Sequence, residues 1–265
     1  MKNYQEELKV VLQILSNASK IVMDIYHGDF AIQYKKDQSE VTTADIASEE
    51  IIKKGLLHSF PNYAILSEET YDTKERLNND YCWIVDPLDG TKDFVNKTNN
   101  FSINIALSYQ NEIVLGAISV PFYQKVYYAL KNQGSYKLEK NHLQKIHVSD
   151  KKDHLTMLTS QFFFKEKNKY DQHPSIEKMI ALGSSYKACL IAEGKAEICV
   201  KEDPHSKEWD TAPSEIIIAE AGGIMGNIYG QKIYYNKKDV YNHQGFIIAN
   251  HEEVFNQFKM KEECK

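Results

Sequence analysis

An apolar segment that ends in two closely spaced aspartates constrains this chain more than any other feature of its sequence. Residues 83–85 read Trp-Ile-Val, the pattern of a buried strand, and Asp86 and Asp89 follow on a turn rich in proline and glycine. Two carboxylates this close together are costly to bury unless a cation neutralises them. Because oxygen ligands on a short loop suit Mg²⁺, the segment predicts a magnesium site, to which the Leu88 carbonyl could contribute.

Two further acidic residues lie where ligands gather in layered α/β folds. Glu68 follows a predicted strand over 63–66, and Asp210 directly precedes a predicted helix over 211–221. Taken separately, each feature has an ordinary explanation: a surface turn for the aspartate pair, a solvated loop for Glu68 and a helix N-cap for Asp210. None of these explanations accounts for all of the carboxylates together, so the set favours a shared metal site.

The rest of the chain has the pattern of a mixed α and β protein. Helical spacing of apolar residues predicts helices over 4–27, 43–58, 175–181, 184–193 and 211–221 and from 251 onward. Apolar runs bounded by turn residues predict strands over 63–66, 81–85, 101–109, 113–120, 125–130, 135–138, 155–160 and 196–200 and near 224 and 245–248. Within a polar stretch over 139–153 we expect the boundary between two halves, residues 1–145 with the metal-binding loops and residues 146–265 completing the active site.

Composition excludes several classes of function. The net charge of −5 argues against a nucleic-acid-binding protein that relies on a basic face. The longest mostly apolar run, 113–120, is too short to cross a bilayer, so we expect no integral membrane segment. A polar N-terminus without a secretory core, and four cysteines without metal or disulfide spacing, favour a cytoplasmic protein. Since Arg76 is the only arginine, a bound phosphate must be held mainly by lysines, hydroxyls, backbone N–H groups or metal.

Three segments of the chain resemble the signatures of a known family. Asp86-Pro-Leu-Asp-Gly-Thr, Ser67-Glu-Glu and Trp209-Asp-Thr are similar to the three motifs of the inositol monophosphatase superfamily of lithium-sensitive, Mg²⁺-dependent phosphatases. The resemblance runs from about residue 35 to residue 223. It implies a layered αβαβα sandwich as the fold, and a metal-dependent hydrolase of phosphate monoesters as the activity.

The resemblance also implies roles for individual residues. Carried over position by position, the family's metal ligands for two or three Mg²⁺ fall on the side chains of Glu68, Asp86, Asp89 and Asp210 and on the carbonyl of Leu88. Thr91 matches the threonine that helps to activate a water molecule. The proton that this water loses would pass through Thr91 toward Asp45 or Glu68, one of which serves as the partner base.

Two further segments lean toward one branch of the superfamily. Gly90-Thr-Lys-Asp-Phe and Gly183-Ser-Ser-Tyr-Lys look like the CysQ-type 3′(2′),5′-bisphosphate nucleotidases, which remove the 3′-phosphate from 3′-phosphoadenosine 5′-phosphate. A glycine and two serines at a helix start can bind an anion, and a lysine one turn on adds positive charge. The alternative is that Ser184 only caps a helix and Lys187 is solvated. The candidate substrate-binding residues are Gly90, Thr91, Gly183, Ser184, Ser185 and Lys187.

The chain departs from the branch at four positions outside the proposed metal centre: Glu40, Ala188, Lys201 and Pro213. An inositol-1-monophosphatase-like enzyme or a broader sugar-phosphate phosphatase therefore remains the alternative enzyme. A catalytically inactive nucleotide sensor is the alternative that is not an enzyme; it predicts a broken ligand position, and the sequence shows none. In each case the expected partner is a small phosphorylated metabolite, a nucleotide bisphosphate or a sugar or inositol phosphate. Both a monomer and a homodimer are compatible with the sequence.

Overall fold

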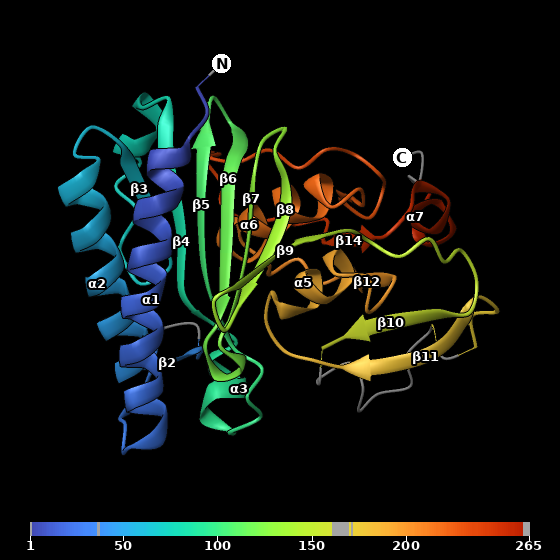
Figure 1. Ribbon diagram of the computed structural model, residues 1–265, viewed down its shortest axis with the longest axis horizontal. Coiled ribbons are helices and arrows are strands. Elements are labelled where there is room, and N and C mark those ends of the chain that lie inside the picture. Colours follow the sequence, from blue (N-terminus) through green and yellow to red (C-terminus); the bar gives the residue numbers. More distant parts are fainter. Residues whose placement is uncertain (1, 36–37, 161–169, 171, 262–265) are drawn as a thin grey trace.

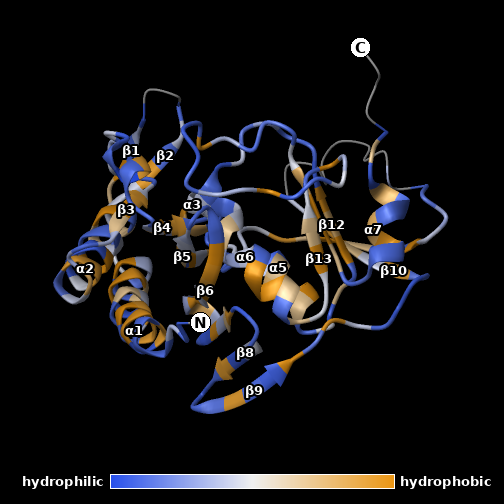
Figure 2. Ribbon diagram, turned by 90° about the horizontal axis from the view of Figure 1, so that it is seen from above, coloured by the Kyte–Doolittle hydropathy of each residue, from blue (hydrophilic) through white to orange (hydrophobic). Residues whose placement is uncertain are grey.

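The chain folds into five alternating layers of helices and sheets. The computed structural model describes residues 2–35, 38–160, 170 and 172–261. Helices α1 (Gln5–His27) and α2 (Thr43–Ser59) cover the outer face of a seven-stranded sheet. Helices α5 (Tyr186–Ala192) and α6 (Glu208–Glu220) lie between that sheet and a five-stranded sheet, and α7 (Glu252–Phe258) covers the far side (Figures 1 and 2). This arrangement confirms the expected αβαβα sandwich.

The larger sheet carries the acidic strand near one edge. Its strands follow one another in the order β3-β4-β5-β6-β7-β8-β9, and only the first pair is parallel. Their bounds are β3 (Ala64–Ser67), β4 (Tyr81–Asp89), β5 (Ser102–Tyr109), β6 (Glu112–Val120), β7 (Lys125–Leu130), β8 (Gly134–Glu139) and β9 (His142–Ile146). Because β3 and β4 are parallel, Glu68 and the aspartate pair emerge at the same end of the sheet.

The smaller sheet combines parallel and antiparallel pairs in the order β11-β10-β12-β14-β13. Its strands are β10 (Leu155–Thr159), β11 (Ile176–Ala181), β12 (Ile198–Lys201), β13 (Ile224–Gly226) and β14 (Phe246–Ala249). A separate hairpin of β1 (Ile32–Tyr34) and β2 (Glu40–Thr42) precedes α2. Short helical turns complete the fold: η1 (Glu75–Asn78), α3 (Thr91–Val95) and η2 (Pro121–Tyr123).

One predicted helix, over 175–181, is wrong, because residues 176–181 form strand β11. The apolar residues Ile176, Met179 and Ile180 are spaced three and four apart, which imitates one face of a helix. In the fold, this segment is the edge strand of the smaller sheet and pairs in parallel with β10, which satisfies the backbone groups on that side. The polar stretch expected to be a boundary also contains an element, because β9 adds an exposed edge strand to the larger sheet.

Helix α6 starts three residues earlier than the sequence predicted. Asp210 is therefore its third residue, and Pro213 lies inside the helix instead of in the first turn. Proline has no N–H to donate to the carbonyl four residues back, which is that of Trp209. The Asn104 side-chain amide on β5 donates to this carbonyl across 3.4 Å, so the neighbouring sheet compensates for the missing helical hydrogen bond.

The two sheets are not two independent bodies, because α6 packs on the larger sheet. A Cβ atom added at Gly116 on β6 would lie 2.6 Å from the Ile216 side chain and 2.8 Å from the Pro213 carbonyl oxygen. The larger sheet ends at Ile146 and the smaller one begins at Leu155, close to the expected division. The division into two halves, residues 1–145 and 146–265, stays a prediction.

Two further findings bear on the sequence analysis. Within the described residues, no helix combines the length and the apolar character needed to cross a membrane. Cys82, Cys189 and Cys199 are buried free thiols, and Cys264 lies outside the described residues.

Candidate active site

The turn at the end of β4 holds the aspartate pair in a fixed shape. The pairing of β4 with β5 shifts register between Asp86 and Asp89, so the strand bulges where the two carboxylates diverge from the sheet. Asp86 is 1% exposed, and its Oδ1 accepts a hydrogen bond from the Leu88 N–H at 3.1 Å. The buried Ser48 hydroxyl on α2 donates to the Pro87 carbonyl at 2.8 Å and fixes the turn from the other side.

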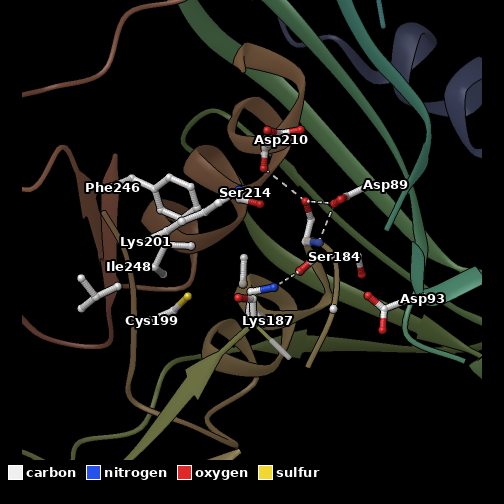
Figure 3. Close-up of a pocket in the computed structure, with 15 residues that line it drawn as sticks. Asp89, Asp93, Ser184, Lys187, Cys199, Lys201, Asp210, Ser214, Phe246 and Ile248 are labelled. Carbon is white, nitrogen blue, oxygen red and sulfur yellow. Dashed lines mark hydrogen bonds between the residues drawn. The ribbon is translucent and has the colours of Figure 1, made fainter. Parts of the chain in front are cut away.

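Asp210 from α6 joins this pair across more than a hundred residues of sequence. Carboxylate oxygens of Asp86, Asp89 and Asp210 lie within 4.8 Å of one another, close enough to bind one metal ion. Asp210 is held by a hydrogen bond of 2.8 Å from the Lys207 N–H to its Oδ2. In Figure 3, Asp89 and Asp210 lie on either side of the loop that carries Ser184. We call these three residues the acidic trio.

The electrostatics of the acidic trio fit a cation. Burial and the neighbouring carboxylates of Glu68, Asp89 and Asp210 raise the pKa of Asp86 well above its ordinary value. Burial likewise raises the pKa of Asp210 to about 7; Lys201 opposes this shift, and Asp89 and Glu68 add to it. A divalent cation would remove this repulsion. Because every donor is an oxygen, the site suits Mg²⁺ better than a metal that prefers nitrogen or sulfur.

Glu68 lies beside the acidic trio but is not part of it. It directly follows β3, and its N–H donates to the Val85 carbonyl on β4 at 3.2 Å. Its carboxylate pairs with the Lys35 ammonium at 3.1 Å and lies 3.8 Å from that of Lys207. Lys35 also pairs with Glu69 at 2.7 Å. These lysine contacts could not be predicted from the sequence, because residues 35, 68 and 207 share no motif.

The predicted water-activating group has the partner that the resemblance implied. The Thr91 hydroxyl lies 3.1 Å from Asp45 Oδ1 and 3.2 Å from the Leu88 carbonyl oxygen. The other oxygen of Asp45 accepts from the N–H and hydroxyl of Thr42 at 2.7 and 2.6 Å, which completes the N-terminal cap of α2. Thr91, Asp45 and Leu88 are therefore in contact, although they come from three different elements.

Ser185 contacts the acidic trio directly. Its N–H and its hydroxyl both lie within hydrogen-bond distance of Asp89 Oδ2, at 2.6 and 2.5 Å. The Asn104 side chain donates to the same oxygen at 3.1 Å. Asn104 is a residue that sequence reasoning missed, because a single polar residue in an apolar strand carries no motif. The role of Ser185 in substrate binding stays a prediction, since here it orients Asp89.

A cavity of about 190 Å³ extends from the acidic trio toward the smaller sheet (Figure 3). It is lined by residues that include Gly183, Lys187, Lys201 and Phe246. The Lys187 ammonium turns back toward the carbonyls of Leu182 and Ser184, at 3.1 and 2.8 Å. Burial lowers the pKa of Lys187. Burial also acts to lower the pKa of Lys201, but nearby carboxylates, chiefly that of Asp210, raise the pKa above its ordinary value.

The glycines of the predicted substrate site are required by close packing. Gly90 has a φ of +86°, and Gly183 lies so close to Asp93 that an added Cβ would be 2.2 Å from its Oδ2. Ser184 has a φ of 53°, and its side-chain oxygen accepts from the Tyr186 N–H at 3.3 Å. Gly183, Ser184, Ser185 and Lys187 line the cavity, whereas Gly90 and Thr91 directly follow Asp89 in the chain. The contacts of all six residues with a substrate stay predictions.

Comparison with known proteins agrees with this geometry. The sequence pattern described as Inositol monophosphatase family matches residues 3–262. The chain is 34% identical over 245 residues to the 3′(2′),5′-bisphosphate nucleotidase CysQ of Salmonella typhimurium, covering 91% of this chain and 99% of the relative. The crystal structure of CysQ from Bacteroides thetaiotaomicron is 30% identical, with a TM-score of 0.76 over 94% of this chain and 99% of that chain. An IMPase from Thermotoga maritima has a TM-score of 0.81 at 25% identity, over 95% and 96% of the two chains.

The five layers and the acidic trio define a metal-dependent phosphatase. More specifically, the chain belongs to the inositol monophosphatase family, and it is similar to the CysQ-type members of that family. The family and the fold expected from the sequence are both confirmed.

Proposed function

We propose that this phosphatase removes the 3′-phosphate of a 3′(2′),5′-bisphosphate nucleotide, with 3′-phosphoadenosine 5′-phosphate as its substrate. The observation that carries the proposal is the cavity beside the acidic trio, which contains two half-buried lysines, Lys187 and Lys201, and the ring of Phe246. A bisphosphate needs a second site of positive charge, separate from the place where one phosphate reacts. The similarity to nucleotidases of the CysQ type supports this choice.

Both lysines can serve the phosphate that does not react. The Lys187 ammonium has three donors, and two carbonyls take two of them, which leaves one N–H for a ligand. Lys201 lies 3.4 Å from Asp203 and keeps its charge because carboxylates surround it. Phe246, on β14 of the smaller sheet, offers an apolar face to a base. An inositol phosphate with a single phosphate would leave the remaining N–H of Lys187 without a ligand.

The acidic trio, Glu68 and the Leu88 carbonyl would hold two or three Mg²⁺. When bound, Mg²⁺ supplies positive charge to the phosphate oxygens and lowers the pKa of water. The chain's own residues then manage the proton. The Thr91 hydroxyl donates to Asp45 Oδ1, so its oxygen is free to accept a proton from an attacking water while its own proton passes to Asp45. Asp45 is buried, so burial raises its pKa and makes it a better proton acceptor.

A substrate panel tests the proposal. We expect Mg²⁺-dependent phosphate release from 3′-phosphoadenosine 5′-phosphate to exceed that from inositol 1-phosphate, fructose 1,6-bisphosphate and adenosine 5′-monophosphate, and lithium to inhibit it. A strong preference for inositol 1-phosphate would instead support the inositol-monophosphatase alternative. Absence of phosphate release from every compound, with Mg²⁺ present, would support the inactive sensor.

One substitution tests the role of the acidic trio in that reaction. Asp89→Asn removes a charged ligand but keeps the shape of the side chain, so we expect turnover to fall below about 1% of wild type. Asp24→Asn is the matched control, because Asp24 is an exposed carboxylate on α1, the helix on the outer face of the larger sheet. Circular dichroism should show both variants folded. Wild-type phosphate release by Asp89→Asn would refute the metal assignment.

A further inference from the structure

Arg76, the only arginine of the chain, is buried at a distance from the reacting groups. It lies in η1, in the segment that leads away from Glu68, and is 4% exposed. Its Nε and Nη2 donate to Asp72 Oδ2 at 3.1 and 2.9 Å. Its Nη1 donates to Asn236 Oδ1 at 2.6 Å, and Nη2 donates also to the Lys237 carbonyl at 2.7 Å. The guanidinium therefore joins the segment after Glu68 to a loop that is distant in sequence.

That loop in turn holds the start of α6. The N–H groups of Asn236 and Lys237 donate to the two carboxylate oxygens of Glu208, at 2.6 and 2.8 Å. Asn236 has a φ of 55°, a left-handed conformation that turns two consecutive N–H groups toward one anion. Glu208 is fully buried and is the first residue of α6, two positions before Asp210.

A second set of contacts from the same loop reaches the first turn of α6. The Asn242 N–H donates to the Ser206 carbonyl at 2.7 Å, and the Asn242 side chain donates to the Thr211 hydroxyl at 3.0 Å. The Lys237 ammonium binds the Asn242 side-chain oxygen at 2.9 Å. Residues 236–242 thus hold this turn on both sides of Asp210, and Arg76 holds the loop.

We propose that Arg76 and Glu208 are positioning residues, which set the separation between Glu68 and Asp210 and thereby the affinity of the site for Mg²⁺. The inference rests on the proposed function, in which Glu68 and Asp210 are both ligands. Metal affinity depends on ligand positions within a few tenths of an ångström, and groups that orient ligands affect it strongly. Neither Arg76 nor Glu208 contacts the acidic trio among the described contacts, so both act through the backbone that carries the ligands.

The guanidinium of an arginine suits this positioning role better than the ammonium group of a lysine. Arg76 makes four hydrogen bonds to two separate segments through its planar fork. Lysine presents a single nitrogen and cannot span both segments in one geometry. Arg76→Lys therefore keeps the charge and removes the link, which separates the positional effect from the electrostatic one.

The experiment measures Mg²⁺ binding by calorimetry without substrate, in wild type, Arg76→Lys and Glu208→Gln. We expect each variant to bind Mg²⁺ about tenfold more weakly. Phosphate release lost at low Mg²⁺ should be regained as Mg²⁺ is raised. Because both residues belong to one link, the double variant should lose less affinity than the two single losses combined.

The matched control is Glu197→Gln. Glu197 is also a buried carboxylate, 2% exposed, and accepts from the Ser149 hydroxyl and the Thr156 N–H, both at 2.8 Å. We expect this variant to lower the melting temperature without changing Mg²⁺ affinity. If Arg76→Lys does not fold, Glu208→Gln still decides, because it keeps the side-chain volume.

Two failures can be distinguished. Wild-type Mg²⁺ affinity in a folded Glu208→Gln variant of an active enzyme would overturn the positioning role and leave the proposed function intact. A wild-type protein that binds no Mg²⁺ and releases no phosphate would refute the proposed function itself. An equal loss of affinity in Glu197→Gln would show a general effect of destabilisation and would also overturn the inference.

Discussion

Asp89 shows how far single residues could be predicted from the sequence. Its position after an apolar strand and before Gly90 marks it as a ligand candidate, and the structure places it in the acidic trio. Of the two groups that orient it, Asn104 was missed and Ser185 was predicted for substrate binding instead, because they come from another strand and a distant loop. A motif preserves residues that are adjacent in sequence, whereas orienting contacts depend on how the elements pack.

Glu215 on α6 gives a residue-scale prediction about stability. It lines a cavity of about 160 Å³, and within the described residues no hydrogen bond or ion pair reaches its carboxylate. Burial raises its pKa to about 7; Glu112 and Glu220 add to the shift, and Lys232 and Lys131 oppose it. Because the folded state holds the proton more tightly than the unfolded state, this contribution to stability is present at low pH and is lost as pH rises toward 7.

Glu215→Gln should therefore stabilise the protein at about pH 8 by on the order of 2 kcal/mol and have little effect at about pH 4.5. Urea unfolding across this range measures the difference from wild type. The control is Glu252→Gln at an exposed position of α7, which should change the free energy of unfolding little at any pH. A constant difference between wild type and Glu215→Gln at every pH would contradict the prediction.

At the scale of elements, local sequence patterns predicted the long helices and the antiparallel strands β5 to β8. Packing determined the conformation of β11 and the position of Pro213 in α6. Helix α1 is confirmed because its apolar face recurs with helical period over 23 residues. Strand β11 is too short for such a signal, so the pairing with β10 determines its conformation. The predicted helix start at residue 211 would put Pro213 in the first turn, whereas Pro213 lies inside α6. The contact of Asn104 from the neighbouring strand shows why a proline is tolerated there.

The contact of α6 with β6 yields a prediction at this scale. Gly116→Ala should lower the free energy of unfolding by about 1–3 kcal/mol, because the added methyl would meet the Pro213 backbone and not only a movable side chain. Gly28→Ala is the control, since its nearest contact would be an ordinary 3.6 Å. Urea denaturation compares the two. Equal stability of the two variants would show that the contact between α6 and β6 accommodates the added methyl group without a measurable loss of stability.

On the scale of the whole molecule, the acidic trio is where the layers meet. Two of its carboxylates come from the larger sheet, and the third comes from a helix of the middle layer. The sequence predicted that these segments converge from the placement of carboxylates after strands and before a helix and from the family resemblance, because composition and periodicity carry no distance between residues 89 and 210. Convergence also means that a metal ion held by the acidic trio would bind the folded state at a site that the unfolded chain lacks.

Mg²⁺ should therefore stabilise the whole fold. A ligand that binds only the folded state contributes about 2.7 kcal/mol at a hundredfold excess over its dissociation constant. We expect thermal unfolding to shift upward with Mg²⁺ in wild type and in the control variant Asp24→Asn. Asp89→Asn should be more stable than wild type without Mg²⁺, because one of three crowded charges is gone, and should gain much less when Mg²⁺ is added. If Mg²⁺ raised the unfolding temperature of Asp89→Asn as much as that of wild type, the stabilising ion would bind elsewhere. The acidic trio, which joins the larger sheet to α6, would then have lost a ligand without any effect on stability.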